Sequence, residues 1–152
     1  MIQRIQSVYF LLAGILPAFS FCVPMARYYD ADGQLTYQLT AATMSAVDGA
    51  TTSHPWGILA FAVISIIMAF ICIFAYKNRI KQISLSNLLL TSLLLLALAF
   101  VGHGYYYGDE LAVRFLPSWG FVFPVLSYVF AFLGRRAVRK DEELVRAADR
   151  IR

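Results

Sequence analysis

Residues 57–76 read GILAFAVISIIMAFICIFAY, a stretch of twenty residues without Asp, Glu, Lys or Arg. An α-helix rises about 1.5 Å per residue, so this stretch is long enough to cross a hydrocarbon core of about 30 Å. Because the core of a bilayer offers a backbone no hydrogen-bond partners, a segment that crosses it must be helical. Residues 57–76 therefore predict a transmembrane helix.

Three further stretches lack charged side chains: residues 5–26, 83–101 and 115–134, which are 22, 19 and 20 residues long. Over the whole chain of 152 residues, 60% are apolar and 14% are charged, whereas soluble domains carry about 45–50% apolar and roughly a quarter charged residues. The length suits a single domain. We therefore predict one all-α membrane domain over residues 1–152, a bundle of four antiparallel transmembrane helices.

The net charge of +4 does not indicate nucleic-acid binding, because the basic residues gather beside the ends of the predicted helices. One side of the membrane receives 11 basic and 4 acidic residues, and the other side receives 2 basic and 5 acidic residues. Lys and Arg beside short loops are retained on the cytoplasmic side. We therefore expect both the N-terminus and the C-terminus in the cytoplasm, and no nucleic-acid partner.

The first stretch has a rival interpretation as a signal peptide. Arg4, the apolar run that follows it and the small residues around Phe19 resemble the three regions of such a peptide. The apolar run continues to Ala26, however, which gives it full spanning length. We therefore expect this helix to stay in the protein.

Residues 27–55 form the largest predicted segment outside the membrane, an outer loop. It contains the pairs Asp32-Gly33 and Asp48-Gly49, which favour tight turns. Between them, apolar and polar residues alternate over residues 35–40, with the period of a half-buried strand. Since an isolated hairpin is only marginally stable in water, we predict a small β-hairpin or three-stranded cap that packs on the outer ends of the helices.

Residues 135–152 predict a cytoplasmic helical tail that continues from the fourth helix. Leu144, Ala148 and Ile151 fall on one helical face, and Glu142 precedes Arg146 by one turn. The mixed charges of residues 141–152 favour docking on a protein, whereas Arg135, Arg136, Arg139 and Lys140 are expected to form a polybasic collar that attracts anionic lipid. The residues expected to contact a partner or lipid on this side are Arg4, Lys77, Arg79, Arg135, Arg136, Arg139, Lys140, Glu142, Arg146 and Asp149.

The short connection between the second and third helices also carries basic residues. Lys77, Arg79 and Lys81 are expected to pair with the acidic residues 141–143 if the tail folds back beneath the bundle. The alternative to such pairing is a polybasic face that attracts anionic lipid.

Both ends of the chain resemble a known family. The segments MIQRIQSVY (1–9), YKNR (76–79) and KDEELVRAADR (140–150) are similar to those of an uncharacterised membrane protein family of Bacteroidota, the domain-of-unknown-function 4293 family. The resemblance covers the whole chain, and the terminal motifs are its most specific parts. It implies a four-helix protein of the bacterial inner membrane and implies no activity. It also argues against removal of the first helix.

His54 and His103 are the candidates for metal chemistry, because both are expected near the outer ends of helices, where Asp48, Asp109 and Glu110 can approach. Their spacing matches no metal motif, and the competing interpretation is two histidines at the membrane interface with their polar edges in water. The sequence therefore predicts neither a metal nor a cofactor. With no phosphate-binding loop and no Ser/His/Asp arrangement of usable spacing, we expect no enzyme. The lack of an acidic residue inside the predicted spans counts against a proton-coupled transporter.

Three functions fit this pattern, and the first is the prediction. It is a non-catalytic accessory or scaffold subunit of an inner-membrane assembly, in contact with membrane lipids and with a protein partner on the cytoplasmic side. The sequence is also compatible with a homo-oligomer. The second is a small transporter or lipid-handling protein. The third is a metal-dependent enzyme of the outer face. The second would need a polar interior lined by Asn87, Thr91, Ser92 and Ser127.

Overall fold

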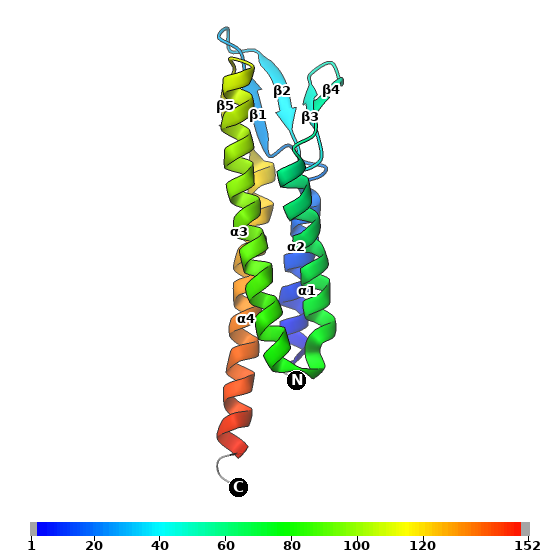
Figure 1. Ribbon diagram of the computed structural model, residues 1–152, viewed down its shortest axis with the longest axis vertical. Helices are drawn as coiled ribbons and strands as arrows, with labels where there is room; N and C mark the ends of the chain where they lie inside the picture. Colours follow the sequence, from blue (N-terminus) through cyan, green and yellow to red (C-terminus); the bar gives the residue numbers. More distant parts are fainter. Residues whose placement is uncertain (1–2, 150–152) are drawn as a thin grey trace.

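The structure, a computed structural model, describes the backbone of residues 3–149 and the side chains of residues 5–76 and 78–147. Its long helices are α1 (Gln3–Phe19), α2 (Trp56–Phe74), α3 (Arg79–Glu110) and α4 (Val122–Asp149), and the short 3-10 turns η1 (Ala75–Lys77) and η2 (Trp119–Phe121) precede α3 and α4. Each long helix packs against the next, and α1 also packs against α4. The four therefore close into a bundle along one axis, with a small sheet at one end (Figure 1).

The apolar stretches of the sequence do form the helices. In the described part of the chain, three helical segments are long and apolar enough to cross a membrane: α2, α3 and the segment Trp119–Ala147. The prediction of a mostly helical protein with apolar spans is confirmed at this level. The predicted ends of the spans differ from the observed ones in three places.

The first predicted span is longer than its helix. α1 ends at Phe19, so its 17 residues rise about 25 Å. The chain then turns, with the amide of Val23 donating to the carbonyl of Phe19 over 2.9 Å. Pro24 lacks an amide hydrogen and disfavours a helical conformation at Val23. The apolar composition therefore continues to Ala26, but the helix does not.

The third and fourth helices also begin and end away from the predicted limits. α3 has 32 residues and extends beyond 83–101 in both directions. The fourth predicted span, 115–134, begins too early, because its first residues belong to a strand and α4 starts only at Val122. The prediction of a helical tail is confirmed over residues 135–149, since α4 continues without a break to Asp149. Residues 150–152 of the predicted tail lie outside the described part of the chain.

The sheet is larger than the predicted hairpin or three-stranded cap. Its five antiparallel strands have the order β4-β3-β2-β1-β5. Gly33 and Gly49 have φ angles of 74° and 84°, which confirms the two predicted turns. The strands are β1 (Ala26–Tyr29), β2 (Leu35–Leu39), β3 (Met44–Ala46), β4 (Thr51–Ser53) and β5 (Arg114–Pro117). The first four come from the outer loop, and β5 comes from the connection between α3 and α4.

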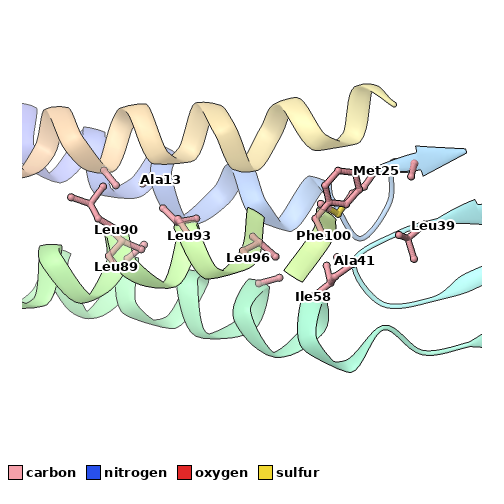
Figure 2. Packing of buried hydrophobic residues seen from close by; sticks show 14 of the residues in the cluster. Ala13, Met25, Leu39, Ala41, Ile58, Leu89, Leu90, Leu93, Leu96 and Phe100 are labelled. Atoms are coloured by element: carbon pink, nitrogen blue, oxygen red, sulfur yellow. The ribbon is translucent and has the colours of Figure 1, made fainter. Parts of the chain in front are cut away.

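One hydrophobic core joins the bundle to the sheet. In Figure 2, Leu89, Leu93, Leu96 and Phe100 follow α3 toward the buried residues Met25 and Leu39 beside the strands. Phe100 stacks on Phe121 with 4.4 Å between the ring centroids. The hydroxyl of Tyr28 on β1 donates to the carbonyl of Gly104 over 3.3 Å. Burial raises the pKa of Tyr28 well above its usual value, so this hydroxyl stays protonated.

A first testable prediction concerns the end of α3. Ala112 has a φ of 53°, a left-handed conformation that costs a residue with a Cβ about 1 kcal/mol and costs glycine little. We expect Ala112→Gly to raise the free energy of unfolding by about 1 kcal/mol, measured by thermal unfolding in mild detergent. Ala97→Gly, in the interior of the same helix, should lower it by a similar amount. A loss of stability in Ala112→Gly would contradict the expectation.

Candidate functional site

The end of the bundle opposite the sheet, where α1 begins and α4 leaves the other helices, is called the terminal end. It contains a buried acidic side chain. Asp141 on α4 is 7% exposed, and its carboxylate accepts a hydrogen bond from the amide Nε2 of Gln6 on α1, which is 5% exposed. A buried carboxylate is costly unless donors satisfy it. The pair therefore fixes the register of α4 against the first turns of α1.

Arg79, the first residue of α3, also contacts α4 at Asp141. The guanidinium Nη1 of Arg79 donates to the backbone carbonyl of Asp141 over 3.1 Å. The tail does not fold back beneath the bundle, because α4 runs past the other helices as one continuous helix (Figure 1). Arg79 thus meets the main chain of α4 and not an acidic side chain. Glu142 instead pairs with Arg146 one turn later on its own helix, at 2.9 Å, as the spacing predicted.

A second polar group at the terminal end holds α2 to α3. The amide Nε2 of the buried Gln82 donates to the carbonyl of Cys72 over 2.9 Å, and the hydroxyl of Ser86 donates to the carbonyl of Gln82 over 2.6 Å. Asn78 accepts from the amide of Lys81 over 3.1 Å and so caps α3. These bonds satisfy backbone groups near the helix ends and fix the connection between α2 and α3.

A groove of about 410 Å³ runs between the first turns of α3 and the tail. It brings together three of the predicted contact residues, Arg139, Glu142 and Arg146, and adds Ile80, Ile83 and Glu143. Residues 143–147, which include two of the groove's lining residues, are all exposed. The groove therefore joins the membrane helices to the free part of the tail.

The other predicted contact residues whose side chains the structure describes do not line the groove. Arg135 is half-buried, and its Nε atom has no hydrogen-bond partner within the described structure. Arg136 and Lys140 are exposed. The side chains of Arg4, Lys77 and Asp149 lie outside the described part of the chain.

The four polar residues that were expected to line the bundle interior do not face one common space. Asn87 and Thr91 are on the exposed face of α3. The buried hydroxyl of Ser92 lies 3.0 Å from that of Ser65, and Ser127 donates to the carbonyl of Ala13 over 2.6 Å. These serines join neighbouring helices, a common use of small polar residues in membrane bundles.

The two histidines make structural contacts with nearby backbone. Nδ1 of the exposed His54 lies 3.1 Å from the carbonyl of Ala42, and Nδ1 of His103 lies 2.9 Å from that of Ala99. The ring of His103 packs so closely on Gly57 that a Cβ there would come within 2.7 Å of it. Among the residues that the structure describes, no three His, Cys, Asp or Glu side chains form a group that can hold a metal ion.

Sequence reasoning missed the pair of Gln6 and Asp141. Gln6 is a polar residue inside a predicted span, and Asp141 directly follows the basic residues of the tail. Each has a local signal of a polar contact, but 135 residues separate them. Only the packing of α1 on α4 brings them together.

The length and hydropathy of the helices place the protein in the class of multi-pass membrane proteins. Over residues 2–151 the chain matches the family described as Domain of unknown function (DUF4293), and it belongs to that family. No curated protein matches the chain. The resemblance to this family is thereby confirmed. Gln6 and Asp141 join the two terminal segments in space.

Proposed function

We propose that the protein is a non-catalytic accessory or scaffold subunit of an inner-membrane assembly, which it contacts through the last turns of α4. The observation that supports this most is the projection of α4 beyond the other three helices as one continuous helix (Figure 1). Contacts of Asp141 with Gln6 and Arg79 hold the base of this projection. A segment that is held at its base and free along its length is suited to docking.

The surface of the projection supports a protein partner. Leu144 is 54% exposed, and Val145 beside it is also exposed. Charged residues of both signs surround them, including Glu143 and Arg146. An apolar patch on a helix with a polar rim is the form of helix that fits a partner's groove.

The placement in the membrane is part of the proposal. All four helices cross the bilayer, α1 with the help of the turn that follows it. The terminal end lies in the cytoplasm, as its basic residues favour. There Arg135, Arg136, Arg139 and Lys140 form a collar that attracts anionic lipid, at about 1 kcal/mol for each basic residue.

The two alternatives have less support. A small transporter would need polar side chains facing the bundle interior, but Asn87 and Thr91 face outward and Ser127 bonds α1. A metal-dependent enzyme of the sheet end would use His54 and His103, each of which lies within hydrogen-bonding distance of a backbone carbonyl.

The double variant Leu144→Glu, Val145→Glu tests the proposal. Tagged wild-type protein, the double variant and the matched control Thr51→Glu, Thr52→Glu, which adds the same two carboxylates at exposed positions of β4, are purified in mild detergent. Mass spectrometry quantifies the proteins that accompany each form. We expect a partner that accompanies both wild-type protein and the control. The amount of this partner that co-purifies should fall at least about tenfold with the double variant, because a buried apolar anchor contributes about 1–3 kcal/mol to binding. The same set of proteins with all three forms would contradict docking through this patch.

A further inference from the structure

The sheet end contains two basic residues on one face. Among residues 20–58 and 102–121 the sequence has only Arg27 and Arg114 as basic residues. Arg27 on β1 pairs with Leu116 on β5, and Tyr29 pairs with Arg114. Side chains alternate along a strand, and Ala26 and Tyr28 are buried, so both arginines lie on the outward face of the sheet.

The two arginines have different surroundings. Arg114 lines a depression of about 440 Å³ with Asp30 and another of about 790 Å³ with Asp109 and Glu110. Arg27 lines a third depression, of about 390 Å³, whose lining in the described structure carries no Asp or Glu. Arg27 is therefore a positive charge without acidic neighbours in its depression, and Arg114 is not.

The depression beside Arg27 combines hydrogen-bond donors with an apolar side. Tyr29 and Ser118 offer hydroxyl groups, and Trp119 offers an indole N–H. Trp119 is 81% exposed, and the exposed Val122 begins α4. The depression thus extends from the sheet onto the start of an apolar helix.

We propose that this depression binds the phosphodiester group of a membrane phospholipid from the leaflet at the sheet end. The planar guanidinium of Arg27 matches two phosphate oxygens, and the hydroxyls of Tyr29 and Ser118 complete the donor set. Trp119 holds the interfacial position that tryptophan prefers, and Val122 meets the acyl chains. This continuity with α4 favours a lipid over a free anion. This site rests on the membrane placement of the proposed function and includes none of the tail residues.

The fluorescence of Trp119 tests the proposal. The chain has two tryptophans, so Trp56→Phe leaves Trp119 as the single reporter. The full chain in detergent is titrated with phosphatidylglycerol and, separately, with diacylglycerol of the same acyl chains, which lacks the phosphate. We expect a saturable change in emission with phosphatidylglycerol and a much smaller one with diacylglycerol.

The matched variants are Arg27→Gln and Arg114→Gln, two exposed arginines of neighbouring strands. Arg27→Gln should weaken phosphatidylglycerol binding about tenfold, since it removes a charge-assisted bidentate contact. Arg114→Gln should change it less than twofold. The affinity of Arg27→Lys should lie between those of wild-type protein and Arg27→Gln, because lysine retains the positive charge but cannot form the bidentate hydrogen bonds of a guanidinium. Unchanged thermal unfolding of each variant shows that the fold is retained.

Three results would overturn the proposal: equal binding by wild-type protein and Arg27→Gln, an equal loss in Arg114→Gln, or equal responses to the two lipids. Inorganic phosphate serves as the competitor. If millimolar phosphate displaces phosphatidylglycerol from Trp119, the site is one for soluble anions and the lipid assignment fails. If phosphate does not compete, the lipid assignment is supported.

Discussion

Replacing Gly120 with valine should lower the free energy of unfolding by about 3 kcal/mol, because the position has no room for a side chain. A Cβ at Gly120 would lie 2.5 Å from the carbonyl oxygens of both Val23 and Pro24. These are backbone atoms held in place, since the amide of Gly120 donates to Pro24 over 3.0 Å and that of Ser118 donates to Met25 over 2.8 Å. Thermal unfolding in mild detergent, followed by circular dichroism, measures the loss.

Gly102→Ala is the control for Gly120→Val. Gly102 lies inside α3, and no heavy atom lies within 4 Å of a Cβ built there. Because glycine in a helix costs about 0.5–1 kcal/mol relative to alanine, this change should stabilise the protein by that amount. Wild-type stability in Gly120→Val would contradict the close approach of the two chain segments.

Gln6→Leu should lower the free energy of unfolding by about 2–3 kcal/mol. The change removes the amide that donates to the buried carboxylate of Asp141, and a buried charged acceptor that loses its donor is costly. The last turns of α4 should loosen as well, because this contact fixes α4 to α1. Thermal unfolding measures the first effect, and amide hydrogen exchange of residues 141–147 measures the second.

The double variant Gln6→Leu, Asp141→Leu controls for the size and shape of the new side chain. Replacing both partners of a hydrogen bond with apolar groups is often nearly neutral, so the double variant should recover most of the stability that Gln6→Leu loses. Equal instability of the single and double variants would show that the two side chains are not coupled. The cost would then come from packing at Gln6.

The sequence predicts the helices because their signal is local. A stretch such as 57–76 contains its own apolar residues, and hydropathy over one window is sufficient to find it. The ends of the helices depend on other segments. Phe115 belongs to an uncharged run and looks like part of a span, but its ring packs 5.8 Å from that of Tyr28 and 5.7 Å from that of Phe100. Pairing with β1 therefore decides its conformation, and composition does not show this.

The candidate site has the same limitation. The tail residues Arg139, Glu142 and Arg146 were predictable as one charged surface, because they share the face of a single helix. The contribution of Ile80 and Ile83 to the same groove comes from another helix. The contact between Gln6 and Asp141 is harder still to predict, because no sequence pattern around either residue indicates the other as its partner. Contacts between distant segments are thus the part of the site that only the fold supplies.

The position of β5 has a consequence for the biogenesis of the protein. β1 pairs with β2 on one side and with β5 on the other, and residues 114–117 are synthesised long after residues 26–29. Until α3 and the connection after it have been made, one edge of β1 has no strand to pair with, and an open edge invites contact with other chains. The sheet can therefore close only after the third helix is complete. Its closure marks the moment at which the two connections at this end of the bundle become a single folded unit.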